Sequence, residues 1–137
     1  MPTQEEIATL ERFGQRYRRV APVLAELEHD VMGSDYGANG YTTRRQADEL
    51  ARVLALRPGE RLLDVGSGCG WPGLYIAAGS RCDVVVTDMP MPGMRRARAR
   101  IDADDELVRS AAVVATARHL PFRPASFDAV VHTDVLC

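Results

Sequence analysis

The stretch LLDVGSGCGWPGLYIA, residues 62–77, carries more information than any other part of this chain. It begins with a short apolar run that ends in Asp64, passes through several glycines, and becomes apolar again at helical spacing. Glycine suits such a turn because it adopts positive φ and lets a ligand approach the backbone without meeting a Cβ atom. Pro72 suits a first helical turn, where its missing N–H is no loss. The stretch therefore predicts a strand, a turn and a helix whose amino end faces a ligand-binding crevice.

The residues after this stretch alternate between strand and helix patterns. Three further apolar runs are typical of strands buried on both faces. They are DVVVTD at 83–88, AAVVA at 111–115 and FDAVVH at 127–132. Helices are expected between them, the first from about Pro72 to Gly79 and the second from about Gly93 to Asp102. The alternation predicts a doubly wound α/β fold with a mostly parallel sheet.

The residues before the stretch have helical patterns instead. Thr3 with Glu6 forms a capping-box pattern that begins an amphipathic helix. Pro22 interrupts or restarts this helix, and a second helical run ends at Gly33. Residues 33–43 are rich in glycine and predict a loop, after which a third helix is expected.

Composition excludes several classes of function. The net charge is −2, and all 17 cationic residues are arginines, so neither a uniformly basic nucleic-acid surface nor lysine Schiff-base chemistry is expected. No apolar run approaches the roughly 20 residues that a membrane helix needs. The three cysteines, Cys69, Cys82 and Cys137, match neither a zinc spacing nor a disulfide framework. These features favour a soluble, cytoplasmic protein without a metal site.

The glycine-rich turn also resembles a known motif. The run Asp64-x-Gly66-x-Gly68-x-Gly70 is similar to motif I of the S-adenosylmethionine-dependent methyltransferases with a Rossmann-like fold. Asp88 ends the next strand, where that family has an acidic residue that binds both ribose hydroxyls of the cofactor. The resemblance covers about residues 36–134 and includes, in order, Leu120, Pro121, Phe122, Phe127 and Asp128.

This resemblance implies a site for S-adenosylmethionine and a small-molecule methyl acceptor. The implied cofactor-binding residues are Asp64, Gly66, Ser67, Gly68, Gly70, Asp88, Met89, Thr116, Ala117 and Tyr41. Met89 would pack on the adenine, and Tyr41 would lie over the methionine end. Thr116 replaces the Asp with which the family usually binds the adenine amino group, so reduced affinity is expected. Trp71 would pack against the N-terminal helices or shield the methionine part.

Two polar residues follow the fourth predicted strand, near where the family has residues beside the transferred methyl group. His132 could remove a proton from a hydroxyl acceptor, and Asp134 could orient His132 or hold an amine. A histidine at a strand end is also commonly a surface residue, so both interpretations stay open here.

The family's sheet has seven strands in which the first four take the order 3-2-1-4, whereas this sequence ends at Cys137, just after the fourth. We therefore expect a helical cap and loop at residues 1–43 and a partial Rossmann-like, S-adenosylmethionine-binding domain at residues 44–137. The fourth strand would be an exposed apolar edge. Either the chain is a truncated product, or this edge pairs with a second copy in a homodimer.

Two other functions are compatible with the same residues. The chain could be a non-catalytic domain that binds the cofactor or self-associates. It could also be a fragment of an NAD-dependent oxidoreductase, because GCGWPG at 68–73 fits the dinucleotide pattern G-x-G-x-x-G. The dinucleotide fingerprint begins directly at the strand end. Here Asp64, Val65, Gly66 and Ser67 lie between the apolar part of the strand and the first glycine of GCGWPG, which argues against the oxidoreductase.

Overall fold

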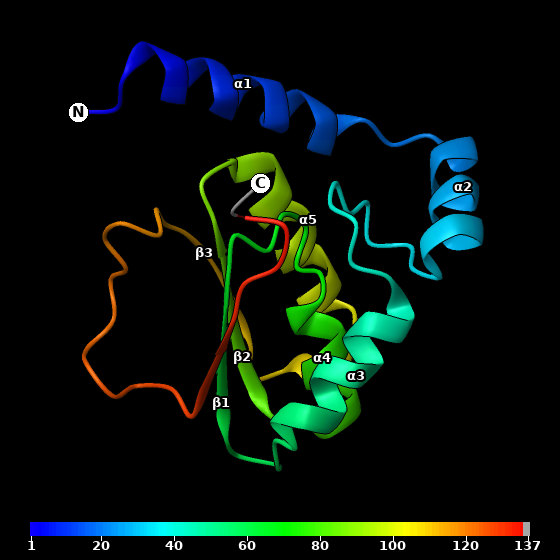
Figure 1. The fold of residues 1–137 in the computed structure, drawn as a ribbon, viewed down its shortest axis with the longest axis vertical. Helices are drawn as coiled ribbons and strands as arrows, with labels where there is room; N and C mark the ends of the chain where they lie inside the picture. The colour runs from blue at the N-terminus through cyan, green and yellow to red at the C-terminus, as the bar shows by residue number, and fades with distance from the viewer. Residues whose placement is uncertain (136–137) are drawn as a thin grey trace.

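A computed structural model describes residues 1–135, whose centre is a four-stranded parallel sheet (Figure 1). The strands are β1 (Arg61–Val65), β2 (Asp83–Asp88), β3 (Ala111–Val114) and β4 (Ala129–Val131). Their order is β3-β2-β1-β4, and each neighbouring pair is parallel. This order confirms the Rossmann-like arrangement that the sequence predicts. The third cysteine, Cys137, lies outside the described residues.

The helices that pack on the sheet lie on one face of it within residues 1–135, whereas the segment from 115 to 128 loops past the other face (Figure 1). They are α3 (Arg44–Leu54), α4 (Gly73–Ser80) and α5 (Met91–Asp102), and a short 3-10 helix follows at Asp105–Leu107. Helix α5 begins at Met91 and not at the expected Gly93, because Pro92 fits a first helical turn.

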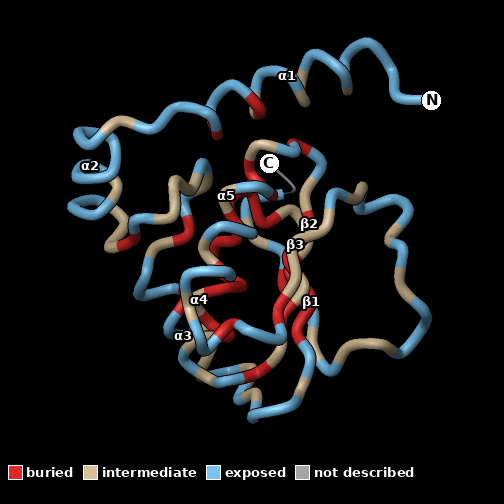
Figure 2. The backbone as a smooth tube through the Cα atoms, turned by 180° about the vertical axis from the view of Figure 1, so that it is seen from behind, coloured by how far each residue is buried: buried red, intermediate tan, exposed pale blue. Residues whose placement is uncertain are grey.

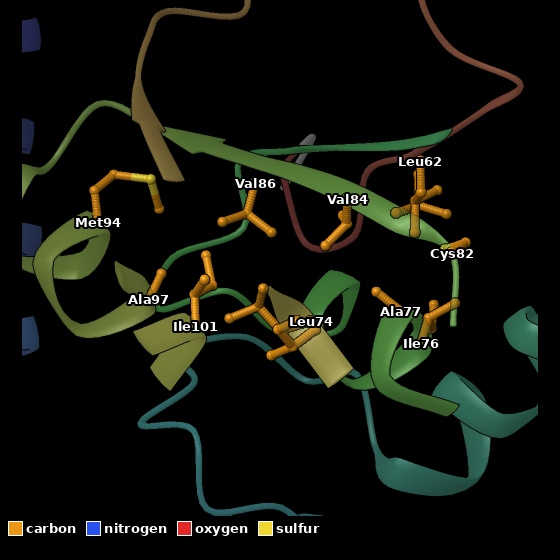
Figure 3. Packing of buried hydrophobic residues seen from close by; sticks show 12 residues of the cluster. Leu62, Leu74, Ile76, Ala77, Cys82, Val84, Val86, Met94, Ala97 and Ile101 are labelled. Atoms are coloured by element: carbon orange, nitrogen blue, oxygen red, sulfur yellow. The ribbon is translucent and has the colours of Figure 1, made fainter. Parts of the chain in front are cut away.

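The core fills the space between the sheet and these helices. Figure 3 shows Val84 and Val86 of β2 directed toward Leu74 of α4 and Ile101 of α5, and all four side chains are buried. Burial of each such side chain contributes about 1.5–3 kcal/mol to folding. The apolar strand runs therefore anchor β1 and β2, at whose carboxyl ends the glycine-rich turn lies.

The N-terminal helices extend beyond this core and are mostly exposed (Figure 2). Helix α1 (Gln4–Arg18) begins with the predicted capping box between Thr3 and Glu6 and packs against α5. Helix α2 (Pro22–Met32) has no buried residue and ends at Gly33, as predicted. No helix within residues 1–135 is long and apolar enough to cross a membrane. Helix α1 contacts α5, so residues 1–43 are not separate from the rest of the fold. The division of the chain after residue 43 stays a prediction.

Candidate functional site

The glycine-rich turn forms a backbone cradle at the carboxyl end of β1. Gly66, Gly68 and Gly70 all have positive φ, at 73°, 61° and 96°, as the sequence predicts. The amides of Gly66 and Ser67 donate to the carbonyl oxygen of Thr87 at 2.8 and 2.9 Å, which ties the turn to β2. A Cβ atom on Gly68 would lie only 2.8 Å from the hydroxyl of the Tyr17 side chain, so the turn accepts close contacts that other residues would block.

Asp88 lies beside this cradle at the end of β2. Its Oδ2 accepts a hydrogen bond from the Gly68 amide and its Oδ1 accepts one from the Met89 amide, both at 2.7 Å. Burial raises the pKa of the Asp88 carboxyl, and the two amide bonds oppose that shift. Each carboxylate oxygen can accept more than one hydrogen bond, so Asp88 keeps capacity for two ligand hydroxyls.

Asp64 lies behind the turn and holds the start of α4. Its side chain is fully buried, and its Oδ2 accepts a hydrogen bond from the Gly73 amide at 2.8 Å. Its Oδ1 has no hydrogen-bond partner among the described residues. Burial raises the pKa of Asp64 to about 8, and the nearby charge of Asp88 adds to the shift. At neutral pH Asp64 is therefore mostly protonated and positions the turn from within the fold.

A hollow with a volume of about 230 Å³ opens between the turn, α1 and the loop at residues 38–41. Its wall contains five of the residues that the sequence predicts, namely Tyr41, Gly66, Ser67, Gly68 and Asp134. The other predicted residues are not part of this wall, namely Asp64, Gly70, Asp88, Met89, Thr116, Ala117 and His132. The Oγ atom of Ser67 is buried without a hydrogen-bond partner in residues 1–135, so a ligand in this hollow could satisfy it.

The residues expected around the adenine follow the neighbouring strands β2 and β3. The Ala115 amide donates to the Asp88 carbonyl oxygen at 3.1 Å, which places Thr116 and Ala117 directly after this contact. The Thr116 Oγ1 accepts a weak hydrogen bond from the Arg118 amide at 3.3 Å. Met89 is 37% exposed and therefore has a free apolar surface.

Asp134, two residues after His132, binds the loop before α3. Its Oδ2 accepts hydrogen bonds from the amides of Tyr41 and Thr42 at 3.0 and 3.1 Å and from the Thr42 hydroxyl at 2.8 Å. Asp134 thus fastens the loop at 41–42 to the segment that follows β4. The catalytic roles of His132 and Asp134 stay predictions. His132 itself is exposed.

Sequence reasoning missed the contribution of α1 to this site. Phe13, Arg16 and Tyr17 line the hollow, and Tyr17 is buried against the turn. Burial and the charge of Asp88 raise the pKa of Tyr17, so its hydroxyl stays neutral. The helical spacing of Tyr17 in the sequence marks it as part of an apolar face, but nothing in that spacing indicates what the face covers.

Trp71 packs between the loop before α3 and helix α4, whereas the sequence predicts packing against the N-terminal helices or shielding of the methionine part. Its ring lies 5.0 Å from that of Tyr36 and 5.2 Å from that of Tyr75, and its Nε1 donates to the Thr42 carbonyl oxygen at 2.8 Å. Trp71 therefore joins the loop before α3 to α4 and also forms part of the wall of the hollow.

Comparison with known proteins gives the family of this chain. A family model described as a methyltransferase domain matches residues 63–137, more than half of the chain. The chain therefore belongs to the methyltransferase domain family. It is 34% identical over 139 residues to the 27-O-demethylrifamycin SV methyltransferase of Amycolatopsis mediterranei, an alignment that covers 94% of this chain and 47% of that protein. The chain thus spans about half the length of this curated relative.

Solved structures share the fold. A SAM-dependent methyltransferase from Thiobacillus denitrificans, in complex with S-adenosyl-L-homocysteine, matches with a TM-score of 0.63 and 17% identity over 84% of this chain and 44% of its own. The [4+2]-cyclase SpnF matches with a TM-score of 0.62 and 22% identity over 94% of this chain and 48% of its own. Since a protein named as a cyclase has this fold, the fold alone does not define the reaction.

Proposed function

We propose that this chain binds S-adenosylmethionine at the carboxyl ends of β1 and β2 and serves as the cofactor-binding part of a small-molecule methyltransferase. The observation that carries the proposal is the pairing of Asp88 with the Gly68 amide beside a hollow that is lined by the same turn. This pairing brings a carboxylate and a close-approach backbone to one place, which is what a nucleoside with two hydroxyls requires. Membership of the methyltransferase domain family supports it.

The residues of the chain fit this cofactor. Asp88 would accept hydrogen bonds from the two ribose hydroxyls. Met89, whose side chain is exposed, would pack on the adenine, and Thr116 and Ala117 would lie at the edge of the ring. The buried Ser67 hydroxyl, which lacks a partner in residues 1–135, would bind the polar end of the methionine part. Tyr41 would cover that end, and Asp64 would position the turn.

The cofactor, when bound, supplies an electrophilic methyl group. The chain's own contribution is to hold the acceptor in line with that group and to keep water away, and such positioning can supply a large part of the rate. Asp134 fastens the loop at 41–42 over the hollow and so acts as a positioning residue. His132 is the candidate base for an acceptor that must lose a hydroxyl proton.

Calorimetric titration with S-adenosylhomocysteine tests the proposal. Wild type should bind saturably, and Asp88→Asn should weaken binding by about tenfold or more, because a hydrogen bond to a charged group contributes about 1.5–3 kcal/mol. Asp128→Asn is the matched control, since Asp128 also accepts a backbone amide bond, from Arg61 at 2.7 Å, but at the opposite end of the sheet.

The outcomes of this titration are distinct. Equal affinity in wild type and Asp88→Asn, with the fold intact by circular dichroism, would refute the proposed role of Asp88. Binding of NAD in place of S-adenosylhomocysteine would favour the oxidoreductase.

A second candidate function is cofactor binding without methyl transfer. The cyclase SpnF has the same fold, so this fold is not restricted to methyl transfer, and we retain this candidate. Saturable S-adenosylhomocysteine binding, together with S-adenosylmethionine that stays intact in the presence of acceptors, would select it.

A further inference from the structure

A second hollow lies next to the proposed cofactor site, between α1, α2 and the loop after α2. Its volume is about 430 Å³, within the range of small-molecule pockets. Figure 1 shows α2 and the loop that follows it side by side, beyond the end of α1. The two hollows share Arg16, Ala38 and Asn39 in their walls, so a ligand in one would border a ligand in the other.

The wall formed by α2 is apolar, and none of its side chains is buried in the hydrophobic core between the sheet and its helices. Val20, just before the helix, and Leu24, Leu27 and Val31 within it lie at helical spacing and line the hollow. These four side chains are between 48% and 79% exposed, and α2 buries no residue. A helix that leaves its apolar stripe facing a hollow has a surface available for an apolar molecule.

The loop that forms the opposite wall is held in place by Glu28. Its carboxylate accepts hydrogen bonds from the Ser34 hydroxyl at 2.7 Å and from the amides of Tyr36 and Gly37 at 2.9 and 2.7 Å. These three hydrogen bonds engage both carboxylate oxygens of Glu28 and hold the loop in a defined position. Specific contacts within the chain therefore shape this wall of the hollow.

The polar part of the wall is rich in cations. Arg16, Arg19 and Arg96 line the hollow, and none of them forms an ion pair with a carboxylate in residues 1–135. The two acidic residues of the wall are already engaged, Glu28 by the loop and Asp35 by Arg100 at 3.5 Å. Arg16 donates a hydrogen bond to the Asn39 Oδ1 at 3.1 Å, and Arg96 donates one to the Tyr17 carbonyl oxygen at 3.4 Å. Guanidinium charges without a carboxylate partner favour a ligand that carries an acidic group.

We infer that this second hollow is the acceptor site and that its ligand is an apolar molecule with an acidic group, such as a carboxylate or phenolate. The inference rests on the proposed function, because it treats the neighbouring hollow as the cofactor site. The apolar skeleton would lie on the α2 stripe, the acidic group would bind the arginines, and the shared wall would bring the acceptor beside the cofactor.

Two fluorescent probes with the same dansyl ring, one an anionic sulfonate and the other a neutral sulfonamide, test the inference. They are dansyl sulfonate (5-dimethylaminonaphthalene-1-sulfonate) and the neutral dansylamide, and Trp71, the only tryptophan of the chain, reports their binding by energy transfer. We expect saturable binding of the sulfonate, weakened about tenfold in the double variant Leu24→Gln with Leu27→Gln. Glutamine keeps the helix propensity of leucine. Val23→Gln is the matched control on α2, because Val23 is exposed but does not line the hollow.

The charge is tested separately. Arg19→Gln should weaken binding of dansyl sulfonate and leave that of dansylamide unchanged. Equal sulfonate affinity in wild type and the double variant, or no saturable binding, would overturn the inference. So would a concentration-dependent dimer in sedimentation that the double variant abolishes, because the stripe would then bind a second copy.

Titration with S-adenosylhomocysteine separates this inference from the proposed function. Its affinity should be the same in wild type, the double variant and Val23→Gln. Cofactor binding without probe binding would refute only the acceptor site. Probe binding without any cofactor binding would refute the proposed function and, with it, the role of this hollow as an acceptor site.

Discussion

Asp64 and Asp88 are carboxyl groups on neighbouring strands, and their surroundings give them different tasks. Asp64 is sealed behind the turn, where burial favours its protonated form and where it supports the start of α4. Asp88 is at the strand end, where two backbone amides bind its carboxylate. The ordered spacing of acids and glycines thus combines one residue that stabilises the cradle with one that would bind the ligand in the proposed site.

The buried Asp64 should make stability depend on pH. Its pKa of about 8 in the fold is above the value of about 4 in the unfolded chain. Between these values the folded protein holds a proton that the unfolded chain lacks, so the free energy of unfolding should fall as pH rises from about 5 to about 8. Asp64→Asn should remove a slope of up to about 1.4 kcal/mol per pH unit, measured by urea unfolding.

The control for this prediction is Asp102→Asn. Asp102 lies at the exposed end of α5 and pairs with Arg98 at 2.6 Å, so its replacement should keep the wild-type slope. Identical slopes for wild type and Asp64→Asn would show that Asp64 is ionised in the fold.

At the scale of the elements, α5 packs directly on the glycine-rich turn. A Cβ atom on Gly93, in the first part of α5, would lie 2.5 Å from the carbonyl oxygen of Gly68. Gly79 lies in α4 and has open space around the same position, with no heavy atom within 4 Å. The two helical glycines therefore have different reasons to be present, and only Gly93 is required by a close contact.

This difference predicts opposite effects of one substitution. Gly93→Ala should lower the free energy of unfolding by about 1–3 kcal/mol, because α5 must move away from the turn. Gly79→Ala should raise it by about 0.5–1 kcal/mol, as usual for an unstrained helical glycine. Denaturant unfolding of both variants measures the pair. A stabilised Gly93→Ala protein would mean that α5 does not touch the turn.

At the scale of the whole molecule, the sheet ends at β4, which pairs only with β1 within residues 1–135. Val130 of this edge strand is 55% exposed. In the 137-residue chain studied alone, an exposed apolar edge favours pairing with another strand, so we propose that this chain self-associates through β4. Val130→Lys should shift sedimentation toward the monomer, whereas Val53→Lys, at an exposed position on α3, should not. A wild-type chain that is monomeric at every concentration would contradict the proposal.

The sequence predicts the parts of the fold that depend on local pattern. Apolar strand runs predict the sheet, positive-φ glycines predict the turn, and the capping box at Thr3 predicts the start of α1. Contacts between distant segments are not visible in such patterns. The hydrogen bond that the Tyr41 amide donates to Asp134 joins residues 93 positions apart, and Tyr17 reaches the turn only because α1 packs on α5.

The central claim is that the carboxyl ends of β1 and β2 bind S-adenosylmethionine, and amide chemical shifts of the isotope-labelled 137-residue chain test it most directly. On addition of S-adenosylhomocysteine, the amide signals of Gly66, Gly68 and Met89 should shift together, while those of Glu60 and Asp83, at the opposite end of the strands, should stay in place. Unchanged signals throughout, or shifts confined to the opposite end, would contradict the claim.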